Sequence, residues 1–469
     1  MKPLHEWSAT ELRAGLAQND IRATEVIDSC LRIIEQDNDK LQAFITVCAD
    51  QALAAAQQID EARGRGEPLG PLAGIPFSAK DLTPTAGVRT TKGSLIYQDW
   101  VPTQDALCIA RLKQAGGILI GKTNTPEFGM GAHAKNPLYG PTANPYDPTH
   151  SSGGSTGGAA VSVATGMCAL AQGTDMGGSV RTPASFCGVV GLRPAAGRIP
   201  RSRKSLLWDY LDTDGILART VEDAALMLSV MAGWEAHDPI SIAAPWPLPA
   251  FDTAALDPRL GQVRVGFSPD LGIATIDTQV QAVFERAIAQ LQSICQDVVP
   301  AHPDCSMAQP AFETMRAALL WYKQKHHYEK YFDQLTDTVR WNVGRGKGLA
   351  AFDFLTAAAQ RDQLYRNFLT FFETHDILAT VSTCVLPFPH DQPEVLMVND
   401  TPLSNIIDYL KITYTISLTG LPAVSIPCGW TDTGLPIGMQ LIGPPQRETS
   451  LLQFAHGLQA ELGFHHRWP

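Results

Sequence analysis

Residues 151–198 read SSGGSTGGAAVSVATGMCALAQGTDMGGSVRTPASFCGVVGLRPAAGR. Two serines in this stretch, Ser155 and Ser179, are each framed by glycines, in GGSTGG and GGSVR. Glycine is used where the backbone must come close to a reacting atom or adopt a positive φ. A hydroxyl set among backbone N–H donors is half of an acyl-transfer site, and the other half is a base. The stretch therefore indicates nucleophilic chemistry, with a pair of plain tight turns as the alternative.

The candidate base is an isolated lysine, Lys80, in the hydrophobic segment GIPFSAKDL at residues 74–82. Ile75, Phe77 and Ala79 precede it at alternate positions, which predicts a strand entering the core. A lysine acts as a base only when it is neutral, so burial or a cationic neighbour must lower its pKa by several units. The pattern alone favours an exposed lysine at the end of a strand, and a catalytic role requires that the side chain be buried.

The two serines differ in what precedes them. The segment around Ser155 matches G-x-S-x-G, the nucleophile elbow of α/β-hydrolases. The match is weak, because an elbow follows a hydrophobic strand and the residues before Ser155 read as a loop. Ser179 follows the strand-like segment ALAQGT at 169–174, and the N–H groups from Met176 to Ser179 are expected to point inward at an oxyanion. Two such serines in one short window favour catalysis more than either does alone.

Composition and charge exclude several classes of protein. The chain has 469 residues, of which 45% are hydrophobic and 18% charged, which suits a large core and not a disordered protein. A formal net charge of −11 argues against a nucleic-acid-binding surface, since phosphate contacts need clustered Lys and Arg. The densest basic run, RIPRSRK at 198–204, is short, and we expect it to be a solvated loop or to pair with acidic residues.

The nine cysteines are scattered, odd in number and never spaced as CxxC. This usage fits the reduced thiols of a cytoplasmic protein better than a disulfide framework or a zinc site. The N-terminal sequence MKPLHEWSATEL lacks the charged-then-apolar pattern of a signal peptide. The longest run of low charge, residues 153–174, is too rich in Gly, Ser and Ala for a membrane span and is expected to be a buried helix. We therefore expect a soluble, cytoplasmic protein with neither a membrane nor a nucleic-acid partner.

The chain alternates between helical and strand-like patterns. Three helices are expected in residues 1–65 as an outer layer, the first opened by a capping box at 8–11. From residue 72 onward, short apolar segments alternate with Gly/Pro turns and helical stretches, which predicts an α/β fold with a mixed sheet flanked by helices. A Pro- and Ala-rich stretch at 239–258 is interpreted as a surface excursion, so residues 1–469 are expected to form a single large domain.

Six segments, in order along the chain, make it resemble the amidase signature family, the Ser-cisSer-Lys amide hydrolases. They are GIPFSAKDL (74–82), GKTNTPEFGMG (121–131), NPYDPTHSSGGSTGGAA (144–160), GTDMGGSVRTPASFCGVVGLRP (173–194) and, more loosely, ARTVEDAALML (218–228) and GLPAVSIPCGWTDTGLPIGMQLIG (420–443). The resemblance covers nearly the whole chain, and the glycine-serine signature is highly specific. It implies a mixed, twisted sheet covered by helices on both faces, a catalytic core at 72–200, and a variable helical region at 300–375 that shapes the substrate pocket.

The resemblance also implies a role for each residue of the signature. Ser179 is expected to be the nucleophile, Ser155 the bridging serine after a cis Gly154–Ser155 peptide bond, and Lys80 the terminal base. Neutral Lys80 takes a proton from Ser155, which takes one from Ser179 as Ser179 attacks an amide carbonyl. Water then cleaves the acyl-enzyme, so neither a metal nor an organic cofactor is implied.

The remaining site assignments follow from the same resemblance. The backbone N–H groups expected to hold the oxyanion are those of Met176, Gly177, Gly178 and Ser179. The side chains expected to support the reacting groups without reacting themselves are Asp175, Arg181 and Thr156. The residues expected to bind the substrate are Gly129, Met130, Trp321 and Tyr322. Thr156 is a departure, because the family usually has a second serine there, but the hydroxyl is retained.

Three functions stay open at this point. The first is a stand-alone hydrolase of small or aromatic carboxamides, anilides or carbamates (urethanes), acting on a small molecule as a monomer or homodimer. The second is the A subunit of a glutamine-dependent tRNA amidotransferase, which usually has Gln after the signature arginine where this chain has Thr182. That departure argues against it, as does the segment RSRKSLLWDYLDTDG at 201–215. The third is a non-catalytic binding protein with the same fold, which the intact set of Lys80, Ser155 and Ser179 opposes.

A rival nucleophile is Cys187, in the segment SFCG. It lies in an apolar run with no evident His partner. We therefore interpret it as a small buried residue.

Overall fold

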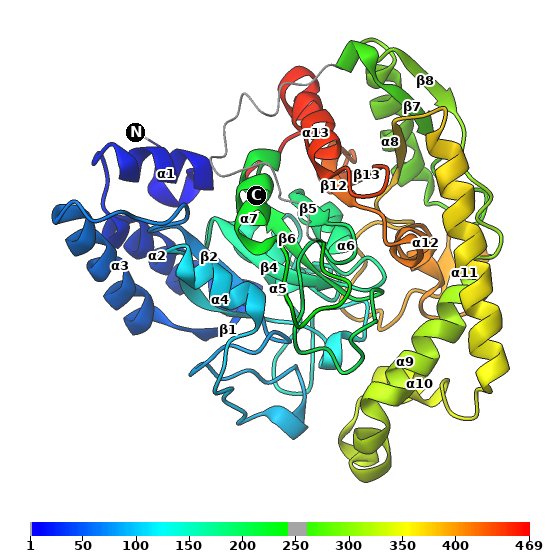
Figure 1. Cartoon of the computed structure of the whole chain (residues 1–469), viewed down its shortest axis with the longest axis horizontal. Helices are drawn as coiled ribbons and strands as arrows, with labels where there is room; N and C mark the ends of the chain where they lie inside the picture. The colour runs from blue at the N-terminus through cyan, green and yellow to red at the C-terminus, as the bar shows by residue number, and fades with distance from the viewer. Residues whose placement is uncertain (1, 243–259) are drawn as a thin grey trace.

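The computed structural model describes residues 2–242 and 260–469, and its centre is one large mixed sheet (Figure 1). The eleven strands lie in the order β1 (Phe44–Val47), β3 (Ile118–Thr123), β2 (Pro76–Lys80), β4 (Leu170–Asp175), β6 (Thr213–Ala218), β5 (Val190–Arg193), β12 (Ala423–Trp430), β13 (Pro436–Ile442), β9 (Ile377–Val381), β7 (Arg264–Phe267) and β8 (Asp297–Pro300). A separate two-stranded ladder joins β10 (Met397–Val398) to β11 (Thr401–Pro402).

Helices pack on both faces of the sheet, which confirms the predicted α/β class. They are α1 (Ala9–Ala17), α2 (Ala23–Leu41), α3 (Ala49–Gly64), α4 (Leu107–Gln114), α5 (Gly157–Ala164), α6 (Arg181–Phe186), α7 (Val221–Met231), α8 (Thr278–Leu291), α9 (Ala308–Lys330), α10 (Asp337–Gly344), α11 (Ala351–Phe372), α12 (Lys411–Thr419) and α13 (Glu448–Leu462). Among the described helices, none combines the length and the apolar character that crossing a membrane requires.

Local signals predicted the N-terminal helices well. The capping box at the start of α1 is present: Glu11 N–H donates to Ser8 Oγ (3.1 Å) and Ser8 N–H donates to Glu11 Oε2 (2.6 Å). The predicted buried helix at 153–174 is wrong in its extent. The helix α5 ends at Ala164, because Gly166 has φ +75° and turns the chain toward β4. Most of the predicted surface excursion, residues 243–258, lies outside the described part of the chain.

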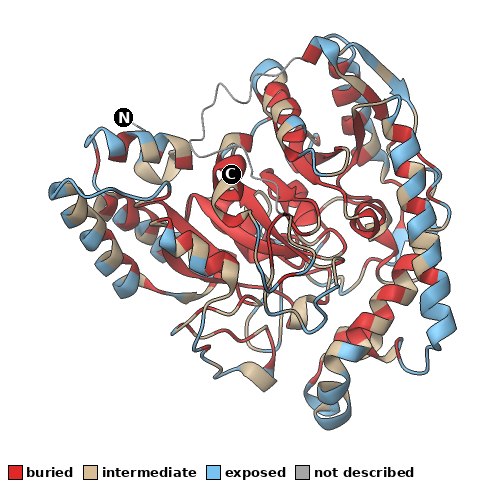
Figure 2. Cartoon of the chain, viewed as in Figure 1, coloured by how far each residue is buried: buried red, intermediate tan, exposed pale blue. Residues whose placement is uncertain are grey.

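The central strands are buried along their whole length (Figure 2). Every residue of β2, β4 and β6 is buried, so polar side chains on these strands must find partners inside the protein. The strands β2 and β4 are parallel neighbours, and their carboxyl ends meet at one edge of the sheet. Lys80 is the last residue of β2, and the segment from Met176 onward directly follows β4. The topology therefore brings the predicted base beside the second glycine-serine loop.

The basic run at 198–204 pairs with carboxylates, as predicted. Among the described residues it forms the ion pairs Arg198–Glu448 (3.0 Å), Arg201–Asp212 (2.7 Å), Arg201–Asp214 (3.6 Å) and Lys204–Asp238 (2.8 Å). All nine cysteines lie in the described residues and none forms a disulfide. Cys187 is fully buried, and burial raises the pKa of its thiol, which confirms that it is a small core residue.

Candidate active site

Lys80 lies at the end of β2 with its side chain fully buried. Its Nζ is within hydrogen-bonding distance of three hydroxyls, those of Ser155 (2.7 Å), Thr156 (2.8 Å) and Thr174 (3.1 Å). The alternative of an exposed lysine at the end of a strand is therefore wrong. Burial lowers the pKa of Lys80 to about 7, although three nearby carboxylates raise it. A substantial fraction of Lys80 is thus neutral near pH 7, which is the form that can act as a base.

The two glycine-serine loops meet at one small cavity. The Gly154–Ser155 peptide bond is cis, as the resemblance implies. Ser155 and Ser179 both line a cavity of about 110 Å³, and Thr156 N–H donates to the carbonyl oxygen of Ser179 (3.1 Å), which joins the loops. No hydrogen bond links the two serine hydroxyls in the part of the chain that the structure describes. Such catalytic hydrogen bonds often tighten only when a substrate binds.

The loop after β4 presents backbone N–H groups to this cavity. Met176, Gly177 and Ser179 line it, and their N–H groups have no hydrogen-bond partner among the described residues. Gly178 differs, because its N–H donates to Asp175 Oδ1 (2.9 Å) and the residue does not line the cavity. Of the four expected oxyanion donors, Gly178 is the one whose N–H is already engaged in this structure. Three N–H groups remain free to hold an oxyanion.

A buried cluster of charged side chains anchors this loop on the side that does not face the cavity. Arg181 donates to both carboxylate oxygens of Asp175 (3.1 and 2.8 Å), and neither side chain is exposed. Asp175 also accepts the N–H groups of Gly178 and Val180. Burial alone would raise the pKa of Asp175, but Arg181 and Arg193 hold that pKa well below its usual range. Asp175 and Arg181 thus anchor the loop and do not face the cavity, whereas Thr156 contacts Lys80 directly.

We expect Asp175→Asn to lower the free energy of unfolding by about 3–5 kcal/mol, because it leaves two buried arginines without a carboxylate. Thermal and urea unfolding at pH 7 measure the loss. Since the pKa of Asp175 is lowered in the folded state, its contribution is full above the pKa of the unfolded side chain and is lost as the pH falls through the folded value. The exposed residue Asp20 supplies the control, and Asp20→Asn should change stability by less than about 0.5 kcal/mol. Similar losses in the two variants would contradict the anchoring role.

Gly129 and Met130 line the cavity, at the positions where the substrate is expected. Gly129 has φ +75°, and a Cβ atom there would lie 2.8 Å from Leu82 Cδ1 and 3.4 Å from Ser155 Oγ. A larger residue would therefore crowd the hydroxyl that contacts Lys80.

The helix α9 reaches the cavity with one face only. Phe312, Arg316 and Leu320 line it at intervals of four residues, which matches the helical repeat. Trp321 and Tyr322 lie off this face: Trp321 packs edge-on against Tyr328, and Tyr322 is 59% exposed. Neither Trp321 nor Tyr322 lines the cavity, although both are expected to bind the substrate, because an aromatic-rich segment does not indicate which face of its helix turns to the site.

Other residues of the site carried no local signal in the sequence. Thr174 contacts Lys80 from the end of β4. Thr413, on α12, donates from Oγ1 to the carbonyl oxygen of Gly177 (2.8 Å) and leaves no room for a side chain at Gly178. The four-residue spacing of Phe312, Arg316 and Leu320 is the one pattern that could have been used, since it defines a helix face.

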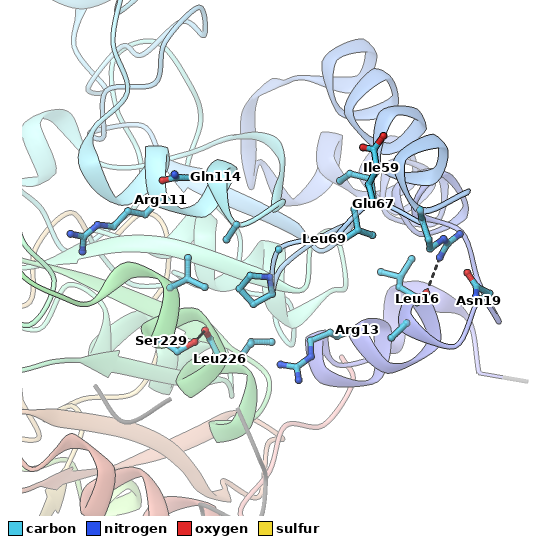
Figure 3. Close-up of a pocket in the computed structure, with 17 residues that line it drawn as sticks. Arg13, Leu16, Asn19, Ile59, Glu67, Leu69, Arg111, Gln114, Leu226 and Ser229 are labelled. Atoms are coloured by element: carbon cyan, nitrogen blue, oxygen red, sulfur yellow. Dashed lines mark hydrogen bonds between the residues drawn. The ribbon is translucent and has the colours of Figure 1, made fainter. Parts of the chain in front are cut away.

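A larger cavity, of about 890 Å³, lies among α1, α4, α7 and the segment after α3 (Figure 3). None of Lys80, Ser155 and Ser179 lines it. Its arginines hold backbone carbonyls: Arg63 donates to Leu16 O (2.9 Å) and Arg111 to Met231 O (2.7 Å). These contacts are structural, so the chemistry is assigned to the smaller cavity.

The comparisons with known proteins agree with this geometry. A family model described as Amidase matches residues 25–452. The chain is 36% identical to the A subunit of the glutamyl-tRNA(Gln) amidotransferase of Moorella thermoacetica, over 99% of each chain. It is 33% identical to an acylamidase of Rhodococcus erythropolis, over 97% of this chain and 96% of the relative.

A solved structure described as "An unexpected vestigial protein complex reveals the evolutionary origins of an s-triazine catabolic enzyme" shares 30% identity and superimposes with a TM-score of 0.90, over 99% of this chain and 100% of that one. The family match spans the two serine loops, the base and the pocket helices alike. The chain therefore belongs to the Amidase family and is an enzyme that acts on amide C–N bonds.

Proposed function

We propose that the protein hydrolyses the C–N bond of a non-peptide carboxamide through an acyl-enzyme on Ser179. The observation that carries this proposal is the buried Lys80, whose Nζ lies 2.7 Å from Ser155 Oγ at the cavity that Ser179 also lines. A nucleophile, a bridging hydroxyl and a base of lowered pKa then share one site.

The reaction begins with proton transfer along this relay. Neutral Lys80 accepts the proton of Ser155 while Ser155 accepts that of Ser179, and Ser179 Oγ forms a bond to the carbonyl carbon. The N–H groups of Met176, Gly177 and Ser179 hold the oxyanion. Collapse of the tetrahedral intermediate breaks the C–N bond, and the relay returns the proton to the departing nitrogen. Water, deprotonated by the same relay, then releases the carboxylic acid and restores Ser179.

The walls of the cavity favour small or aromatic substrates. Much of the lining is apolar, and its large apolar side chains are Leu82, Phe128, Met130, Met176, Phe312, Leu320, Ile406, Ile407 and Leu410. Such a surface suits apolar acyl or leaving groups, so anilides and carbamates belong to the proposed range along with simple amides. We also place the enzyme in the cytoplasm, supported by its nine unpaired cysteines.

A second candidate function is that of the A subunit in a tRNA amidotransferase. The 36% identity to such a protein over 99% of each chain favours it. Thr182, after the signature arginine, and residues 201–215 depart from the pattern usual in those proteins, and they support the stand-alone hydrolase instead.

A hydrolysis screen tests the proposal. The purified chain is incubated with aliphatic amides, anilides, carbamates and glutamine, and amine or ammonia release is measured against the Ser179→Ala variant. We expect the chain alone to cleave at least one amide, anilide or carbamate. Glutamine hydrolysis that appears only after partner proteins are added would favour the amidotransferase, and a complete lack of turnover with tight amide binding would favour a binding protein.

A further inference from the structure

The catalytic cavity contains an arginine that the proposed reaction does not use. Arg316 lines the cavity from α9, four residues after Phe312. The ring of Phe312 lies against the nucleophile loop, because a Cβ atom on Gly177 would stand 3.0 Å from Phe312 Cζ. Four helical residues advance about 6 Å. Arg316 is thus about one helical turn along α9 from the residues that would hold the oxyanion.

The guanidinium of Arg316 is held in place by a neutral partner and has no ion pair among the described residues. Nη1 donates to Asn342 Oδ1 (2.5 Å), and Asn342 is itself oriented by its Nδ2 donating to Thr338 O (2.8 Å). Within residues 2–242 and 260–469, no carboxylate lies within 4.0 Å of Arg316. Glu313, three residues earlier on α9, pairs with Arg345 instead (2.6 Å). Several guanidinium N–H groups therefore remain for a ligand.

Two carboxyl groups line the same cavity, those of Asp212 and Glu394. Asp212 pairs with Arg201 (2.7 Å), so Glu394 is the one to compare with Arg316. Glu394 accepts a hydrogen bond from Thr338 Oγ1 (2.7 Å), and burial raises its pKa. It forms no ion pair with Arg316 among the described residues. Burial lowers the pKa of Arg316 to about 10, so the guanidinium stays charged at neutral pH and is costly to leave unpaired.

The approach to the cavity also carries positive charge, although the chain has a formal charge of −11. A cleft of about 470 Å³ adjoins the catalytic cavity and shares Leu82, Phe128 and Met130 with it. Its charged lining consists of three carboxylates and five cations, namely Asp105, Asp212, Asp214, Lys92, Arg201, Arg203, Lys204 and Lys323. Three of the cations are already paired, Arg201 with Asp212, Lys204 with Asp238 and Lys323 with Asp209. Lys92 and Arg203 have no ion-pair partner among the described residues and supply the positive charge. A cleft with an excess of one sign of charge attracts ligands of the opposite sign.

We propose that Arg316 is a specificity residue that binds a carboxylate on the substrate. The enzyme then prefers amides that carry a carboxylate a short distance from the scissile carbonyl, because Arg316 and the nucleophile loop line the same cavity. The proposal rests on the amide hydrolysis at Ser179 proposed above. Guanidinium and carboxylate form paired charge-assisted hydrogen bonds, which fix the position of the substrate as well as bind it. The carboxylate belongs to either the acyl group or the leaving group, and Arg316 serves both in the same way.

Two pairs of substrates of matched shape test the proposal. On the acyl side, glutaramate is compared with 5-methylhexanamide, in which an isopropyl group replaces the carboxylate. On the leaving-group side, N-acetyl-β-alanine is compared with N-isopentylacetamide. We expect kcat/KM to favour the carboxylate in at least one pair by about 10- to 100-fold, the usual worth of charge-assisted hydrogen bonds. The pair that shows the preference tells whether the acyl group or the leaving group of the substrate carries the carboxylate.

The preference should disappear in Arg316→Met and survive in part in Arg316→Lys, and circular dichroism with the melting temperature shows that both variants are folded. Arg366→Met, which changes an exposed arginine on α11, should keep the preference in full.

A wild-type enzyme that cleaves amides but favours neither carboxylate overturns the inference and leaves the proposed function standing. A preference that survives in Arg316→Met overturns it as well. No cleavage of any amide by the wild type overturns both.

Discussion

Ser179→Ala is expected to lower kcat/KM for amide hydrolysis by at least about 10⁴-fold, because it removes the atom that attacks the carbonyl. The protein should stay folded, since the loop is anchored by Asp175 and Arg181 and not by the Ser179 hydroxyl. Amine release from the best substrate of the screen measures the loss. Circular dichroism and the melting temperature show that the variant is folded.

The matched control is Cys187→Ala. Cys187 is fully buried, and burial raises the pKa of its thiol, so it lacks the thiolate that attack requires. This variant should keep wild-type kcat/KM within about threefold, because it does not touch the cavity. A Ser179→Ala enzyme that retains a tenth of the activity, or a Cys187→Ala enzyme that is inactive but folded, would contradict the assignment of the nucleophile.

Lys80→Met is expected to lower kcat/KM by about 10³-fold or more, because no other base contacts the Ser155 hydroxyl in the part of the chain that the structure describes. The same residue sets the pH dependence. Burial lowers the pKa of Lys80 to about 7, so below that pH the lysine is protonated and cannot accept a proton. In the wild type, kcat/KM should therefore rise through about pH 7 and level off above it, and this rise should be absent from the residual activity of Lys80→Met.

A second buried lysine supplies the control. Lys122, on the neighbouring strand β3, contacts Thr83 O and Thr85 Oγ1, and burial lowers its pKa to about 8. It does not line the catalytic cavity, so a folded Lys122→Met enzyme should keep the wild-type pH profile. A rate maximum near pH 5 in the wild type, or full activity in Lys80→Met, would refute the relay.

Local signals in the sequence locate the candidate reacting groups, and the family resemblance supplies their roles. The alternation of Ile75, Phe77 and Ala79 predicts the strand that ends at Lys80, and the structure has that strand as β2. The glycine-framed serines lie in short loops next to buried strands, where a few neighbouring residues determine the backbone. Thr156 is expected to support the reacting groups without reacting itself, and the structure adds the contact by which it does so, since its hydroxyl lies 2.8 Å from Lys80 Nζ.

The pocket could not be predicted in the same way, because it is built from contacts between distant segments. The orientation of the Gly178 N–H depends on the Asp175 side chain, which accepts a hydrogen bond from it. The face of α9 that turns to the site depends on its packing against the nucleophile loop. The sequence pattern therefore does not predict Arg316 as a cavity residue, and the aromatic character of Trp321 and Tyr322 favours two residues that do not line the cavity. The strand β1, only four residues long and paired to β3, also depends on a distant partner.

Trapping the acyl-enzyme tests the role of Ser179 most directly. The enzyme is acid-quenched during turnover of a p-nitrophenyl ester, digested, and the acylated peptide is identified by mass spectrometry. We predict that the acyl group is on Ser179, that Ser179→Ala carries none, and that Lys80→Met accumulates it much more slowly. Acylation of Ser155 or Cys187, or turnover with no acyl-enzyme at all, would contradict the proposed mechanism.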